Sequence, residues 1–129
     1  MQYLSAKDIL VIHVRIVDTT SGNQGIRDVG LLASLALKPQ TTLFGKETYQ
    51  RVFLKAAVYL ESIATYHVFT DGNKRTAIAA AARFLDINGY TLTASNKEVE
   101  HFVVDVVIKR HPLEKIAQWF KKYSKRKKK

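Results

Sequence analysis

Cysteine is absent from this sequence of 129 residues, and its absence excludes several classes of protein. Without cysteine there is no disulfide framework, no catalytic thiolate and no thiolate metal site. The first residues lack a basic segment followed by an apolar run, so no secretory signal is visible. Charged residues interrupt the apolar runs well before the roughly 20 residues that a membrane span needs. We therefore expect a cytoplasmic protein with no membrane partner.

Three common fingerprints of cofactor and metal sites are also missing. No Gly-x-Gly occurs, and Gly45-Lys46 lacks the flanking residues of a Walker phosphate loop. There is no His-Glu-x-x-His pair. His101 and Asp105 lie one helical turn apart, but without a third ligand nearby we interpret them as a surface pair. His13 falls on an apolar stripe, which is more typical of an interior or rim histidine than of a metal ligand.

The formal net charge of +10 is concentrated at one end of the chain. Seven of the 21 basic residues lie in 121–129, which leaves 14 basic against 11 acidic residues in 1–120. We therefore expect one domain over residues 1–120, followed by a basic, disordered tail over 121–129. Direct nucleic-acid binding is not expected, because Tyr123 is the only aromatic residue among these lysines.

Apolar residues recur at helical spacing through most of the chain, which predicts an all-α domain of about six helices. The first is expected to begin at a Ser5–Asp8 capping box, and the others to span about 28–37, 46–66, 74–88, 95–110 and 112–123. The helix over 74–88 is placed centrally, because its alanine-rich middle lets neighbours approach closely. Residues 40–46 favour an extended conformation, and a small hairpin is one interpretation.

One segment between two predicted helices, residues 67–76, combines groups that bind and transfer phosphate. Its Gly-containing turn enters a helix, where free N–H groups and the positive end of the helix dipole attract anions. Lys74 and Arg75 add positive charge there. Asp71 beside bound phosphates suits Mg²⁺. An imidazole titrates near neutral pH, so His67 can take a proton from an attacking hydroxyl.

A purely structural interpretation of the same segment also remains open. Asp71 or Asn73 can cap the following helix, Gly72 can serve the turn, and Lys74 and Arg75 can be solvated. The residues alone leave these two interpretations side by side. A structural turn, however, needs neither the histidine nor the pair of cations. Nearby Phe69 is interpreted in either case as a buried plug that fixes the loop.

The segment resembles the signature of the Fic/Doc family, His-x-Phe-x-Asp/Glu-Gly-Asn-Gly/Lys-Arg. Six positions carry the match, namely His67, Phe69, Asp71, Gly72, Asn73 and Arg75. Two further stretches look like the death-on-curing (Doc) branch: Gly25-Ile26-Arg27-Asp28 with Gly30-Leu31-Leu32, and Phe84-Leu85 with Asn88-Gly89-Tyr90. The resemblance covers about residues 3–120.

This resemblance implies a compact six-helix Fic/Doc fold in which the motif loop leads into a central helix. It implies Mg²⁺ and ATP as cofactor and co-substrate, and transfer of part of ATP to a protein hydroxyl. The implied roles are general base for His67, metal binding for Asp71, and phosphate binding for Gly72, Asn73, Lys74 and Arg75. By position alone, Thr41, Thr42, Leu43 and Phe44 correspond to a flap that holds the target peptide in extended form.

Two departures from the family pattern decide which part of ATP we expect to be transferred. Most Fic proteins that transfer AMP have Gly where this chain has Lys74, and a second Arg where it has Ile78. Doc proteins share the lysine and resemble kinases that donate the γ-phosphate. Their implied target is translation elongation factor Tu, and the outcome is growth arrest. We therefore expect a protein kinase; AMP transfer and an inactive binding module remain the alternatives.

The sequence also lacks the internal brake of self-inhibited Fic proteins, a helix with Ser/Thr-x-x-x-Glu-Gly/Asn. None of its glutamates is followed by Gly or Asn. An unrestrained toxin harms its host, so we expect a separate antitoxin protein that inhibits this domain in trans. Such an inhibitor would use a segment that folds into a groove on binding.

Overall fold

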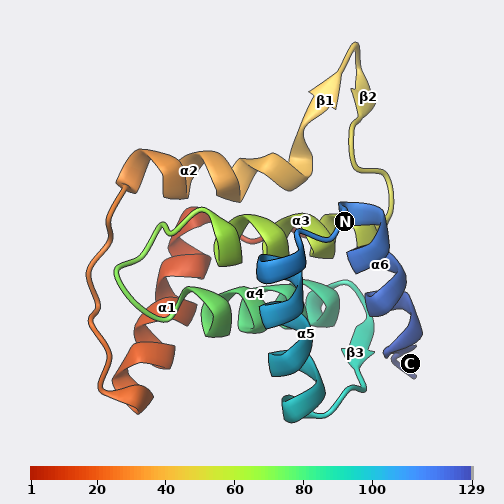
Figure 1. Ribbon diagram of the computed structural model, residues 1–129. Helices are drawn as coiled ribbons and strands as arrows, with labels where there is room; N and C mark the ends of the chain where they lie inside the picture. The colour runs from red at the N-terminus through yellow and green to blue at the C-terminus, as the bar shows by residue number, and fades with distance from the viewer. Residues whose placement is uncertain (129) are drawn as a thin grey trace.

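The computed structural model describes residues 1–128, which form six α-helices and two small antiparallel sheets (Figure 1). The helices are α1 (Ala6–Thr20), α2 (Val29–Leu37), α3 (Val52–Thr65), α4 (Asn73–Ile87), α5 (Asn96–Lys109) and α6 (Leu113–Lys122), with a 3₁₀ turn η1 (Lys38–Gln40) after α2. The strands are β1 (Thr42–Leu43), β2 (Lys46–Glu47), β3 (Tyr90–Leu92) and β4 (Ser124–Arg126). The predicted all-α class is confirmed. Across the described residues, no helix combines the length and the apolar character needed to cross a membrane.

Two helices begin at capping boxes that the sequence predicts. Ser5 Oγ accepts from the Asp8 N–H at 3.1 Å, and the Asp8 carboxylate accepts from the Ser5 N–H at 2.8 Å. Ser95 and Glu98 repeat this arrangement at the start of α5, with distances of 3.1 and 2.9 Å. Each box satisfies two backbone donors that the first helical turn leaves free, and so fixes where the helix begins.

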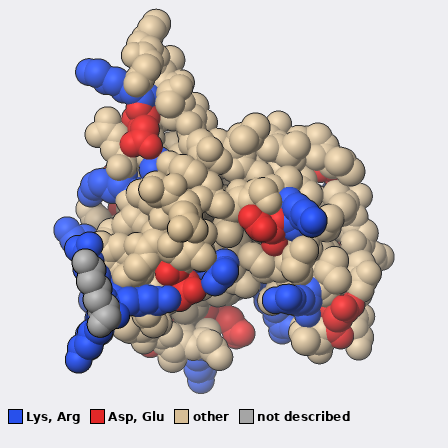
Figure 2. All heavy atoms as spheres, turned by 180° about the vertical axis from the view of Figure 1, so that it is seen from behind, with Lys and Arg blue, Asp and Glu red and all other residues tan. Residues whose placement is uncertain are grey.

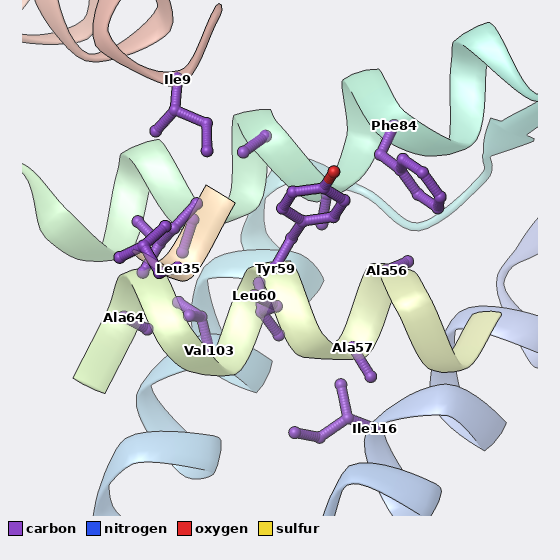
Figure 3. Packing of buried hydrophobic residues seen from close by; sticks show 14 of the residues in the cluster. Ile9, Leu35, Ala56, Ala57, Tyr59, Leu60, Ala64, Phe84, Val103 and Ile116 are labelled. Carbon is purple, nitrogen blue, oxygen red and sulfur yellow. The ribbon is translucent and has the colours of Figure 1, made fainter. Parts of the chain in front are cut away.

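The core is built around α3, of which nine of 14 residues are buried. This helix packs against α2, α4, α5 and α6, while α4 also contacts α1, α5 and β3. Figure 3 shows Tyr59 of α3 directed toward α4, where its ring lies 4.9 Å from that of Phe84. The small buried residues Ala77, Ala80 and Ala81 allow the close approach of α4 that the sequence predicts.

The predicted start of the third helix at residue 46 is wrong, since α3 begins at Val52. Lys46–Glu47 instead pairs with Thr42–Leu43 in an antiparallel hairpin. A buried cation holds its base: Lys55 Nζ, fully inaccessible to solvent, contacts the Pro39 carbonyl oxygen at 3.1 Å and Glu47 Oε1 at 3.2 Å. Arg51, between this hairpin and α3, has an extended backbone with φ −117° and ψ 153°, so the helix begins only after it.

The expected disordered tail is also wrong for residues 121–126. Helix α6 continues to Lys122, and β4 pairs with β3 so that Arg126 lies opposite Tyr90. The Lys127 N–H donates to the Gly89 carbonyl at 2.9 Å, and the Lys127 ammonium forms an ion pair with Asp86 at the end of α4. These contacts tie the basic segment to the body of the domain. Residue 129 lies outside the described residues.

Candidate active site

The loop over residues 66–72 joins α3 to α4 and is held by the connection between α1 and α2. The Arg27 N–H donates to the Val68 carbonyl at 2.7 Å, and the Thr70 N–H donates to the Gly25 carbonyl at 2.9 Å. This connection carries the Gly-Ile-Arg-Asp stretch on which the family resemblance partly rests. Its role is to fix the backbone of the loop.

Helix α1 contributes a second support through His13, which is fully buried as the sequence predicts. The imidazole stacks on the buried ring of Phe69, with 3.7 Å between centroids and 7° between planes. His13 Nε2 donates to the Asp71 carbonyl oxygen at 2.7 Å, since a carbonyl can only accept. His13 therefore positions the loop from a distance of 58 residues in sequence, a role that sequence reasoning missed. The burial of Phe69 agrees with its interpretation as a plug.

Asn73 and Gly72 shape the turn into α4. The Asn73 carboxamide bridges the Phe69 backbone, accepting from its N–H at 3.1 Å and donating to its carbonyl at 2.9 Å. Gly72 is the N-cap residue and has a φ of 76°, which strains any other residue. A Cβ atom at Gly72 would lie 3.0 Å from Val17 Cγ1 of α1. The Asn73 side chain is thus committed to the loop, and a phosphate contact through its backbone stays a prediction.

The first turn of α4 receives no hydrogen bond from a capping side chain in the part of the chain that the structure describes. Asp71 Oδ1 accepts instead from the Gly72 N–H at 2.9 Å, so neither Asp71 nor Asn73 caps the helix. Lys74 and Arg75 are exposed, and neither forms an ion pair within residues 1–128. The result is a helix N-terminus with free donors and two adjacent cations, which is an anion-binding arrangement.

His67 is the second residue of the loop, with an exposed side chain and a left-handed φ of 51°. It lines a pocket of about 430 Å³ between the C-terminal ends of α3 and α5. The other lining residues are Glu61, Thr65, Tyr66, Val106, Val107, Arg110 and His111. Because the His67 imidazole is exposed and is not turned into the core, an incoming hydroxyl can reach it.

The exposed Asp71 is the only acidic side chain of the loop. Among the described residues, no group of three or more His, Cys, Asp and Glu side chains is arranged to hold a metal. The Asp71 carboxylate alone does not suit a metal ion whose ligands must all come from the protein. It fits Mg²⁺, which commonly binds through one or two carboxylates together with phosphate oxygens and water.

The hairpin β1–β2 lies above the layer of α2 and α3 (Figure 1) and contains the four predicted flap residues or adjoins them. Its tip residues Phe44 and Gly45 both have positive φ, at 51° and 76°, as a two-residue hairpin turn requires. Leu43 is 64% exposed and Phe44 96% exposed. The predicted hairpin is confirmed, while contact with a target through Thr41, Thr42, Leu43 and Phe44 stays a prediction.

Comparison with known proteins shows to which family the sequence belongs. A model described as the Fic/DOC family matches residues 3–85, which include α1 to α3, the loop and most of α4. The chain is similar to a protein named Toxin Doc from Mycolicibacterium smegmatis, with 43% identity over 93 residues, 72% of this chain and 69% of that protein. It is also similar to one named Protein kinase doc from Escherichia phage P1, with 30% identity over 89 residues, 69% of this chain and 70% of that protein. The chain belongs to the Fic/DOC family.

Proposed function

We propose that this chain is a Doc-type toxin that transfers the γ-phosphate of ATP to a Ser or Thr hydroxyl of a protein. The single observation that carries the proposal is the uncapped N-terminus of α4, whose first turn carries the exposed Lys74 and Arg75 and which follows the loop that carries the exposed His67. The names of the two relatives, a toxin and a protein kinase, support the same class of activity.

The phosphates of ATP would lie at the first turn of α4. Its free N–H groups and the helix dipole attract an anion, and the exposed Lys74 and Arg75 supply two further positive charges. Arg75 can bind a phosphate through two parallel hydrogen bonds. Asp71 would hold Mg²⁺, and the ion, when bound, would neutralise charge on the phosphates.

His67 would act as the general base. As the acceptor oxygen bonds to the γ-phosphorus, the bond from that phosphorus to the β–γ bridging oxygen breaks and ADP leaves. His67 takes the proton of the attacking hydroxyl. The exposure of the imidazole on the rim of a pocket gives a protein side chain access to it.

Transfer of the γ-phosphate is preferred over transfer of AMP because of two side chains. Ile78 stands where most AMP-transferring Fic proteins have a second Arg, and it packs half-buried against the core instead of facing an anion. Lys74 adds a bulky cation at a position where those proteins have Gly. Both differences change how a nucleotide fits the turn.

The proposed target is a translation factor, elongation factor Tu, whose modification would arrest growth. The exposed hairpin with Leu43 and Phe44 would bind the target in extended form, since a hairpin edge offers backbone donors and acceptors to a strand. The proposed partner of the toxin is an antitoxin protein that inhibits it in trans. Co-purification with the product of a small neighbouring gene tests this partner, and full tolerance of high-level expression of the active enzyme would count against it.

The donor chemistry is tested with ATP labelled at either the α- or the γ-phosphate, added to a cell extract with the purified chain. Label that reaches protein only from the γ position is the expected result, whereas α label would select AMP transfer. No transfer from either would select a binding module. His67→Ala should abolish transfer, by about 10²–10⁴-fold, and leave ATP binding largely intact. Arg75→Ala should weaken ATP binding itself.

A further inference from the structure

A cationic hollow lies at the end of the domain opposite the motif loop. It has a volume of about 530 Å³, and its lining residues are Met1, Arg51, Val52, Phe53, Asn88, Tyr90, Lys121 and Arg126. Three of these are cationic and none is acidic. Arg51 is paired with Glu114 at 2.5 Å, whereas Lys121 and Arg126 form no ion pair within residues 1–128.

The hollow depends on the ordering of the C-terminal segment. Because β4 pairs with β3 in the register that places Arg126 opposite Tyr90, the guanidinium lies over the Tyr90 ring at 6.0 Å from its centroid. Phe53 meets the same ring edge-on at 5.0 Å. Tyr90 and Phe53 are both half-buried, so each is held in place and still presents part of its ring. Cations and aromatic surface are thus combined in one open hollow.

The sequence argues against nucleic-acid binding because the lysine run contains a single aromatic residue. The folded chain supplies the missing aromatic rings from elsewhere, namely from the start of α3 and from β3. Further basic residues neighbour Lys121 and Arg126 in sequence, and Figure 2 shows several Lys and Arg side chains, with acidic side chains between them, at the edge of the molecule where α6 and β3 lie in Figure 1. Those within the described part of the segment are Lys122, Lys125, Lys127 and Lys128.

We propose that this hollow binds single-stranded nucleic acid, with a base against Tyr90 and Phe53 and adjacent phosphates on Lys121 and Arg126. Such ligands combine planar rings with evenly spaced negative charges, and proteins bind them through aromatic residues within a positive groove. An acidic protein segment would match the charges but would leave the aromatic surface without a purpose. The volume is in the usual range for pockets that bind small molecules and is large enough for one nucleotide unit.

The proposed binding site is separate from the transfer site. Arg51 and Phe53 lie at the start of α3 and His67 follows its end, so about 20 Å of helix lies between them. The family match ends at residue 85 and therefore excludes β3, α6 and β4. Failure of the proposed kinase activity would consequently leave this proposal unaffected.

The test measures binding of a fluorescent oligouridylate of about 15 nucleotides, without ATP, over a range of salt concentrations. His67→Ala protein is the parent, so that toxicity does not limit expression. Lys121→Ala with Arg126→Ala should weaken binding at least tenfold and reduce the salt slope by about 1.4, since each phosphate contact on a single strand contributes about 0.7. Tyr90→Leu should weaken binding about fivefold and leave the slope unchanged, because it removes stacking and no charge.

The matched control is Lys7→Ala with Lys97→Ala, which removes the same charge from exposed positions outside the hollow. It should change affinity less than twofold. Equal weakening by both double variants would overturn the proposal in favour of bulk charge. Two results together would overturn the proposal in favour of an acidic protein partner: unchanged RNA affinity of Tyr90→Leu, and displacement of the RNA by oligoglutamate. Full competition by free UMP at equal nucleotide concentration would show a mononucleotide site instead.

Discussion

Replacing Gly72 with alanine should destabilise the domain through two separable effects. The first is the left-handed backbone, since an L-residue at a φ of 76° costs roughly 1–2 kcal/mol. The second is steric, since the new Cβ would lie 3.0 Å from Val17 Cγ1 in the interface with α1, and overpacking of this kind costs about 1–3 kcal/mol. Together they predict a loss of about 2–5 kcal/mol in the free energy of unfolding.

Gly45 provides a matched control, because its φ is also 76° and a Cβ there would meet nothing within 4 Å. Gly45→Ala should therefore show only the backbone cost, about 1–2 kcal/mol. Urea unfolding of both variants, in a His67→Ala parent, measures the difference directly. Equal losses for Gly72→Ala and Gly45→Ala would refute the claim that contact with α1 restricts the turn.

Three further perturbations test the contacts that hold the fold. Glu47→Ala should lower the free energy of unfolding more than Lys55→Met does. It leaves the buried Lys55 ammonium with the Pro39 carbonyl as its hydrogen-bond acceptor, and the lost contact costs about 1–3 kcal/mol. Urea titration of both variants measures the difference. Burial raises the pKa of Tyr59 to about 12. The contribution of its neutral hydroxyl to stability is therefore complete below the unfolded pKa near 10 and is lost as the pH rises toward 12. Tyr59→Phe should reduce the alkaline loss of the free energy of unfolding, measured by urea titration. The hydrogen bond from Lys127 lowers the pKa of Asp86, so the ionised carboxylate stabilises the fold above about pH 4 and this stabilisation is lost as the pH falls further. Lys127→Met should reduce the loss of the unfolding midpoint temperature at acid pH. An unchanged dependence of this midpoint on pH would argue against the ion pair.

Helix positions were predictable where the signal is local. A capping box joins residues three apart, so Ser5–Asp8 and Ser95–Glu98 could be identified from spacing alone. The start of α3 and the strand β4 could not, because their causes are distant in sequence. The buried Lys55 reaches Pro39 and Glu47, and Arg126 pairs with Tyr90 across α5 and α6. For the start of α3 the sequence offered one signal, Lys55 on an apolar helical stripe. For β4 it offered none, because a lysine-rich end does not indicate a strand.

The candidate site divides in the same way between local chemistry and distant support. Its motif is contiguous, so His67, Asp71 and Arg75 were identifiable together as a set of groups suited to phosphate. The residues that support the loop were not identifiable, because they mainly contact its backbone, and backbone groups are the same in every residue. His13 reaches the Asp71 carbonyl, and Gly25 offers its own carbonyl to the Thr70 N–H.

This division has a consequence for the behaviour of variants. Most of the contacts that hold the loop end on backbone atoms of residues 68–71, and one, from the Asn23 N–H, ends on the Asp71 carboxylate at 3.4 Å. None of them uses His67, Lys74 or Arg75. Substitution of these three exposed side chains should therefore change transfer and ATP binding while leaving the unfolding midpoint near that of the parent. Substitution of His13, whose ring lies against Phe69 in the core, should lower stability and activity together. A site built in this way lets His67, Lys74 and Arg75 vary without loss of the fold.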